Sequence, residues 1–205
     1  NLTKGVAGLF KANGVTTFEG TAILHAGCSV EFTSHKGDKE SLQADHIIIA
    51  TGSRSRELES LPQDGEKVIG YREALTLTTQ PKKVIVVGSG AIGVEFAYFY
   101  NALGTEVTIV EFLPTIVPVE DEDVSKQLAR SFKKSGIKIM TSAEVTSVNT
   151  SGRGVKATVK TKKGEEILEA DIVLSAVGIK SNIGNIGLED VGIAVDRDKI
   201  IVNDY

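Results

Sequence analysis

Short runs of apolar, mostly β-branched residues recur along the chain and are typical of strands that are buried on both faces of a parallel sheet. Segments with helical or turn signals separate four of these runs, which we expect to form one four-stranded parallel sheet. They are residues 84–87, 107–110, 137–140 and 171–177. A fifth run, residues 46–50, is expected to form another buried strand, which ends just before Thr51.

Apolar residues at helical spacing predict the segments that connect the strands. Ile92, Phe96 and Leu103 share one face of a helix that Gly104 would end. Two further helices are expected at residues 4–13 and 72–77.

Four acidic residues at 120–123 open a third connecting segment, residues 124–134. Val124, Leu128 and Phe132 follow at intervals of four and predict a helix with one apolar face. The acids suit the start of a helix, where the macrodipole favours negative charge. This explanation is favoured over a metal site.

Alternation of apolar and polar residues predicts two antiparallel meanders. The first comprises two strands within residues 15–34, a turn at Gly37 and a third segment that leads toward residue 46. The second comprises residues 143–149, 154–161 and 165–169. Residues 54–70 are predicted to form a loop, and residues 179–205 an irregular tail with a short strand at 199–202.

The first two strands of the expected parallel sheet flank a glycine motif, G-x-G-x-x-G, at Gly88, Gly90 and Gly93. The first glycine allows a tight turn, the second lets a pyrophosphate approach the backbone, and the third lets the helix pack closely against the strand. The N-terminus of the helix presents free N–H groups to the phosphates. Glu111 follows the second strand, where a carboxylate binds an adenine ribose 2′-hydroxyl and repels a 2′-phosphate. The motif predicts NAD rather than NADP; the alternative is a structural turn that binds nothing.

The carboxyl ends of parallel strands meet at one edge of the sheet, and ligands bind there. With right-handed crossovers between the strands, we expect residues 88–93, Glu111, Val145 and Gly178 to converge at this edge.

Composition narrows the possible functions. The 205 residues carry a net charge of −4 with no basic patch, so we expect no nucleic-acid partner. We expect no membrane partner either, since no apolar run reaches the roughly 18–20 residues that span a bilayer. Cys28 is the single cysteine, which rules out a disulfide or dithiol within the chain. His25, His35 and His46 form no metal-spaced cluster, so we expect no metal site.

Three sequence blocks, in their order and spacing, resemble the pyridine nucleotide–disulfide oxidoreductase family, and within it most closely the dihydrolipoyl dehydrogenases. They are HIIIATGS at 46–53, KVIVVGSGAIGVEFAYFYNALGTEVTIVEF at 83–112 and ADIVLSAVGIKSNIGNIGLEDVGI at 170–193. The resemblance covers essentially the whole chain and implies an α/β fold: a Rossmann-like NAD-binding domain plus part of an FAD-binding domain. The abrupt ends lead us to expect the central part of a larger protein.

The resemblance also implies domains and sites. Residues 1–70 would be the later part of the first FAD-domain segment with a linker, 71–194 the NAD-binding domain, and 195–205 the start of the return to the FAD domain. The implied NAD contacts are Gly88, Ser89, Gly90, Ala91, Ile92, Gly93, Val94, Glu95, Glu111, Val145 and Gly178. The implied FAD contacts are Ala22, Thr51, Gly52 and Ser53. Glu95 and Gly178 would lie near the nicotinamide, Glu111 on the ribose and Val145 against the adenine.

The sequence also departs from the family pattern. It lacks the N-terminal FAD fingerprint, the redox Cys-x-x-x-x-Cys pair, the second FAD-contacting segment and the C-terminal interface domain with its catalytic His–Glu pair. Ile179 and Ser181 replace the usual arginine and proline of G-R-x-P-N. In the parent protein, dihydrolipoamide would reduce the cysteine pair, and electrons would pass through flavin to NAD. We expect this chain to contain no catalytic residue and to bind NAD(H) weakly without turnover.

Two other functions stay open: a related flavin-dependent NADH oxidase or reductase, and a non-catalytic NAD-binding module. A cysteine pair upstream of this chain would favour disulfide chemistry. The resemblance implies a partner, dihydrolipoamide carried on the acyltransferase or lipoyl-carrier subunit of 2-oxo acid dehydrogenase complexes. It also implies a homodimeric parent in the cytoplasm, or in the mitochondrial matrix of a eukaryote.

Overall fold

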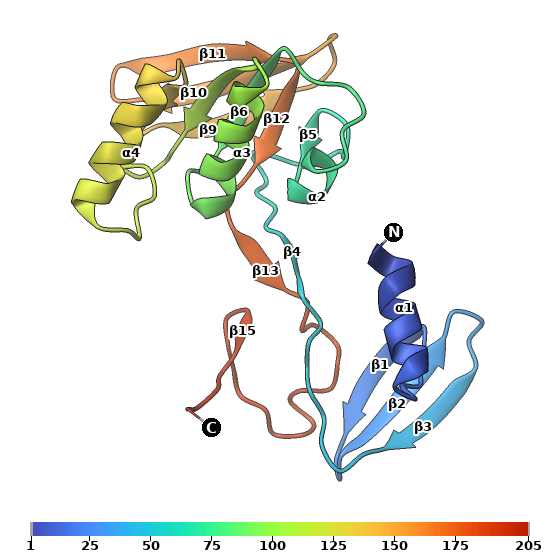
Figure 1. The fold of residues 1–205 in the computed structure, drawn as a ribbon. Coiled ribbons are helices and arrows are strands. Elements are labelled where there is room, and N and C mark those ends of the chain that lie inside the picture. The colour runs from blue at the N-terminus through green and yellow to red at the C-terminus, as the bar shows by residue number, and fades with distance from the viewer. Residues whose placement is uncertain (1, 205) are drawn as a thin grey trace. The chain divides into compact units, whose positions relative to one another are not determined.

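The computed structural model describes residues 2–204, which fall into two compact units. The larger unit is Arg54–Lys180. The smaller one comprises the described residues up to Ser53 together with those from Ser181 onward. Figure 1 labels most elements of both units.

The smaller unit contains one helix and an antiparallel sheet in the order β1-β2-β3. Its elements are α1 (Leu2–Ala12), β1 (Gly20–His25), β2 (Ser29–Ser34), β3 (Lys39–Gln43), β14 (Val195–Asp196) and β15 (Lys199–Ile200). These elements confirm the predicted first helix and first meander. No residue of α1 is buried, and Phe10 on its apolar face is 43% exposed. The chain leaves this unit in β4 (Ser53–Ser55) and returns in β13 (Ile179–Ser181), which pair with each other.

The prediction of a buried strand at residues 46–50 is wrong for this structure. These residues form no strand, and Ile48 is 90% exposed. An apolar run becomes a strand only when a neighbouring strand completes its backbone hydrogen bonds. Within residues 2–204 no strand pairs with this segment.

The larger unit is built on a parallel sheet in the order β5-β12-β6-β7-β8. Its strands are β5 (Val68–Ile69), β12 (Ile172–Ser175), β6 (Lys83–Val87), β7 (Glu106–Val110) and β8 (Lys138–Met140). The four predicted strands are present, although β12 is shorter than residues 171–177. The fifth strand, β5, lies within the segment predicted as loop. It pairs with β12 through only two residues, which is too short a run for an apolar pattern to reveal.

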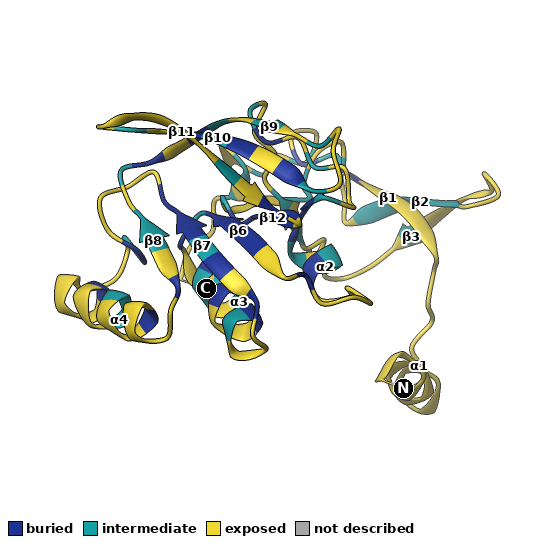
Figure 2. Cartoon of the chain, turned by 90° about the horizontal axis from the view of Figure 1, so that it is seen from above, coloured by how far each residue is buried: buried dark blue, intermediate teal, exposed yellow. Residues whose placement is uncertain are grey.

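Helices and a second sheet cover opposite faces of this parallel sheet. α2 (Tyr71–Ala74), α3 (Ala91–Ala102) and α4 (Glu122–Lys134) pack on one face, where Val84 and Val86 join their core. The meander of β9 (Glu144–Asn149), β10 (Val155–Thr161) and β11 (Gly164–Ala170) covers the other, where Ile85 and Val87 join a second core. Strand β6 is therefore buried on both faces, as its sequence predicts (Figure 2). The meander is confirmed as well.

Helix α2 is shorter than the predicted 72–77 and is held against α3. Burial raises the pKa of the Tyr100 phenol in α3, whose hydroxyl donates to the carbonyl of Ala74 in α2 at 2.7 Å. This bond joins the two helices on the same face of the sheet.

The acidic start and the lysine-rich end of α4 are confirmed, but its predicted apolar face is partly wrong. Phe132 is buried and Leu128 half-buried, whereas Val124 is 53% exposed. Ser125 is buried in its place because its hydroxyl donates to the carbonyl of Val117 at 3.3 Å. The hydrophobic spacing predicted that Val124 would be buried, but the neighbouring, hydrogen-bonded Ser125 is buried instead.

Asp121 caps α4, and its replacement by alanine is expected to lower the free energy of unfolding by about 1 kcal/mol. Its carboxylate accepts the backbone N–H of Asp123 at 2.8 Å. Denaturant unfolding measures the loss. Glu120→Ala is the matched control, since it removes a charge from the same exposed segment and should cost no more than about 0.5 kcal/mol. Equal losses in both variants would show that charge, rather than the cap, stabilises the helix.

Candidate dinucleotide-binding site

The glycine motif forms the turn between β6 and α3, and its three glycines are needed for different reasons. Gly88 has a φ of +96°, and a Cβ there would lie 2.4 Å from the carbonyl oxygen of Ala176. A Cβ on Gly93 would lie 2.1 Å from the carbonyl oxygen of Gly88. A Cβ on Gly90 would meet nothing within 4 Å. The protein itself therefore requires the first and third glycines, and leaves open space beside the second.

Helix α3 begins at this turn, and its first turn has neither a capping side chain nor a negative charge. Gly90 is the N-cap residue in an extended conformation, no side chain caps the helix, and its first turn contains no acidic residue. The first backbone N–H groups of a helix lack partners within it, and the positive end of the helix dipole lies there. An anion such as a pyrophosphate can satisfy both.

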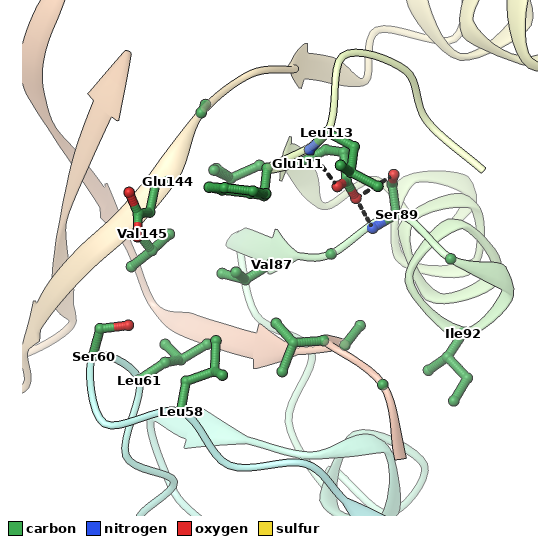
Figure 3. A pocket seen from close by; sticks show the side chains of 18 of the residues that line it. Leu58, Ser60, Leu61, Val87, Ser89, Ile92, Glu111, Leu113, Glu144 and Val145 are labelled. Carbon is green, nitrogen blue, oxygen red and sulfur yellow. Dashed lines mark hydrogen bonds between the residues drawn. The ribbon is translucent and has the colours of Figure 1, made fainter. Parts of the chain in front are cut away.

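Glu111 lies directly after β7, and its side chain is hydrogen-bonded to the glycine turn. One carboxylate oxygen, Oε2, accepts hydrogen bonds from the backbone N–H of Ser89 at 2.8 Å and from its hydroxyl at 2.6 Å. The other oxygen, Oε1, accepts the backbone N–H of Leu113 at 2.8 Å (Figure 3). Glu111 is only 6% exposed. It therefore joins the end of β7 to the glycine turn.

A cavity of about 650 Å³ opens beside the turn at the carboxyl ends of β12, β6 and β7. Its volume lies within the range of ordinary ligand pockets. The walls are mostly apolar. Their polar side chains are those of Ser60, Ser89, Glu111 and Glu144. Val145 of β9 and Gly178, which follows β12, complete the convergence expected from the sequence.

The structure brings together eight of the eleven residues predicted to contact NAD. They are Gly88, Ser89, Gly90, Ala91, Ile92, Glu111, Val145 and Gly178, all of which line the cavity. Gly93 is buried against Gly88, Val94 packs beside the helix-side core, and Glu95 is exposed on α3. None of these last three lines the cavity.

The residues predicted to contact FAD lie in the smaller unit. Ala22 is exposed on β1. Asn182 binds two carbonyls of the Thr-Gly pair: its backbone N–H donates to Gly52 at 2.9 Å, and its side-chain amide to Thr51 at 3.2 Å. Ser53 is half-buried at the start of β4.

Sequence reasoning missed the apolar walls of the cavity. Leu58 and Leu61 come from the segment predicted as loop, where they pair in a β-bridge, and Leu61 is fully buried. Phe112 follows Glu111 at the rim and is 68% exposed. An aromatic residue directly after the acidic residue is a signal that the sequence contains, whereas nothing in the sequence places Leu58 or Leu61 at the cavity.

Residues 2–204 contain neither a cluster of metal ligands nor a helix able to span a membrane. No group of three or more His, Cys, Asp or Glu side chains in this range is arranged to hold a metal ion. None of the helices described there is long and apolar enough to cross a membrane.

The parallel sheet, the glycine turn, the uncapped helix start and the buried acid together are the features of a Rossmann-type fold. The family model of the pyridine nucleotide-disulphide oxidoreductases matches residues 1–205. The chain belongs to this family.

Individual relatives within the family have names that are more specific than the family's. The dihydrolipoyl dehydrogenase of Chlorobaculum tepidum is 43% identical over 196 residues, which cover 95% of this chain and 42% of that protein. The leghemoglobin reductase of Glycine max is 39% identical over 207 residues, covering 100% and 40%. The crystal structure of LpdA from Mycobacterium tuberculosis superposes with a TM-score of 0.84 at 30% identity, covering 95% and 43%. The chain thus spans about two fifths of the length of these relatives. Family members of the dihydrolipoyl dehydrogenase type use FAD and NAD.

Proposed function

We propose that this chain is the NAD-binding portion of an FAD-dependent dihydrolipoyl dehydrogenase, an enzyme that oxidises dihydrolipoamide and passes hydride to NAD. The observation that carries the proposal is the convergence of the glycine turn, the uncapped start of α3 and the buried Glu111 on one cavity. The relatives' names supply the reaction class. The bound cofactors supply the hydride-transfer chemistry, and the protein supplies their binding and orientation.

Each part of the cavity suits one part of the dinucleotide. The backbone from Gly88 to Ile92 would hold the pyrophosphate, because the N–H groups of the helix start lie there and Gly90 leaves room for close approach. Glu111 would accept the adenine ribose hydroxyl, and Val145 would pack against the adenine. Gly178 would lie near the nicotinamide. Gly93 and Val94 would support the turn from within α3, and Glu95 is assigned to the nicotinamide end.

The division into domains is part of the same proposal. Residues 1–70 would belong to the first FAD-domain segment and its linker, 71–194 to the NAD-binding domain, and 195–205 to the return segment. Ala22 and residues 51–53 would contact FAD. The antiparallel sheet of the smaller unit and the positive φ of Gly52, +71°, are compatible with a backbone that approaches a ligand.

This chain by itself is proposed to bind NAD(H) without turnover. Cys28, its single cysteine, is exposed and has no second thiol with which to exchange electrons as a disulfide pair. We assign the whole enzyme a homodimeric state, a cytoplasmic or mitochondrial-matrix location, and dihydrolipoamide of a 2-oxo acid dehydrogenase complex as its partner.

Titration of the chain with NADH and NADPH tests the cofactor assignment. NADH is expected to bind at least about tenfold more tightly, because a 2′-phosphate would lie against the Glu111 carboxylate and like charges in close contact cost several kcal/mol. Nucleotide fluorescence measures both affinities. Repeating the titration at higher ionic strength is the control. The preference for NADH should persist there, since salt screens a buried charge much less than an exposed one. Tighter NADPH binding would refute the choice of NAD, and no binding of either would refute the function.

A related flavin-dependent reductase is the second candidate. The resemblance to a protein named leghemoglobin reductase, at 39% identity over the whole chain, favours it. The NAD site would be the same in both cases, so the nucleotide titration does not separate them. Two assays of the full-length protein do: oxidation of dihydrolipoamide with NAD as the electron acceptor, and oxidation of NADH with another electron acceptor.

A further inference from the structure

Ser89 lies between the first two glycines of the turn and uses all its hydrogen-bonding groups within the protein. Its backbone N–H and its hydroxyl both donate to Oε2 of Glu111. Its carbonyl accepts the backbone N–H of Val117 at 2.9 Å. The residue is 0% exposed. Ser89 is therefore fixed from both sides, and it in turn fixes Glu111.

As a result, the two carboxylate oxygens of Glu111 differ in how many hydrogen bonds they can still accept. A carboxylate oxygen has about two lone-pair positions. Both positions of Oε2 are taken by Ser89, whereas among residues 2–204 Oε1 accepts only the N–H of Leu113. One acceptor position therefore stays available, at Oε1, on a side chain that lines the cavity.

We infer that the Ser89 hydroxyl is a positioning group: it holds the Glu111 carboxylate so that Oε1 alone accepts the 2′-hydroxyl of the adenine ribose. The inference rests on the proposed function and deepens it. Without this hydroxyl, Oε2 regains a free lone pair, and two backbone N–H groups alone hold the carboxylate. The ribose then meets an acceptor that is less rigidly oriented, and part of the binding free energy is lost in ordering it.

Ser89→Ala tests the inference through a comparison of two ligands, NADH and the analogue that lacks the 2′-hydroxyl on its adenine ribose. The variant is expected to bind NADH about fivefold more weakly, the size of one net hydrogen bond. Its affinity for the deoxy analogue should change by less than about twofold, because that ligand has no hydroxyl for Glu111 to accept. A serine that only stabilised the turn would weaken both ligands equally.

Two further variants sharpen the comparison. Ser89→Gly also lacks the hydroxyl and should repeat the result. Ser125→Ala is the matched control, since Ser125 also has a buried hydroxyl, which donates to the carbonyl of Val117 and lies outside the cavity. It should leave the ratio of the two affinities unchanged. Circular dichroism and thermal melting show whether each variant is folded.

The possible outcomes separate the inference from the proposed function. If the unaltered chain binds neither NADH nor NADPH, the proposed function fails, and the inference with it. If the unaltered chain binds NADH, the inference alone is overturned by any of three results for Ser89→Ala: unchanged binding, tighter binding, or equal weakening of both ligands. Unfolding of both Ser89 variants would also overturn it, because the hydroxyl would then serve the fold.

Discussion

Gly93→Ala is expected to lower the melting temperature of the chain and to abolish NADH binding together. The added Cβ would lie 2.1 Å from the carbonyl oxygen and 3.0 Å from the carbonyl carbon of Gly88, both of them backbone atoms. Helix α3 must therefore move away from β6. Overpacking of this kind costs typically 1–3 kcal/mol, which for a chain of this size corresponds to roughly 2–12 °C in melting temperature.

The loss of binding follows from the same movement, since the displaced carbonyl belongs to the turn that would hold the pyrophosphate. Thermal unfolding followed by circular dichroism gives the first quantity, and NADH titration below the melting transition gives the second. A variant with unchanged stability would contradict the packing of α3 on β6 described here. Gly8→Ala in α1 is a suitable control, because a Cβ there meets nothing within 4 Å.

Gly90→Ala is expected to give the opposite combination, a stable fold with impaired binding. A Cβ on Gly90 meets no atom of the protein, and the φ of −67° is one that alanine adopts freely. Stability should change by less than about 1 kcal/mol. The methyl group would instead stand where the pyrophosphate approaches the backbone. If the clash of this methyl group with the ligand costs about 1–3 kcal/mol, as overpacking typically does, NADH binding weakens roughly 5- to 150-fold.

The two glycine variants serve as controls for each other. Both add one methyl group to the same glycine motif. The methyl group on residue 93 would meet the backbone of Gly88, and the one on residue 90 would meet the ligand. If the Gly90→Ala chain binds NADH with unchanged affinity, the pyrophosphate does not bind at this turn. The cavity would then require another ligand.

The sequence predicts the larger unit well because its signals are local. The buried strands β6 and β7, helix α3 and the three-stranded meander each depend on residues close together in the chain. The convergence of the glycine turn with Glu111, Val145 and Gly178 follows from a general property of parallel sheets, whose carboxyl ends meet at one edge. The convergence of these residues was therefore predictable without knowledge of any side-chain contact.

What could not be predicted depends on contacts between distant segments. Residues 46–50 have the composition of a strand, but a strand needs a partner that composition does not supply. Leu58 and Leu61 line the cavity because β5 pairs with β12, about a hundred residues further along the chain. The ribose-binding role predicted for Glu111 says nothing of its three bonds to Ser89 and Leu113, which require the loop after β7 in place.

The order of the strands also determines when the cavity can exist during synthesis. β12 is the last strand of the parallel sheet in the sequence, yet it lies between β5 and β6, near the middle. A chain still emerging from the ribosome has β6, the glycine turn and β7 long before β12 arrives to separate β5 from β6. Closing such long loops is slow. The complete cavity, whose lining includes residues 176–179, therefore forms only after the segment through Gly178 has been made.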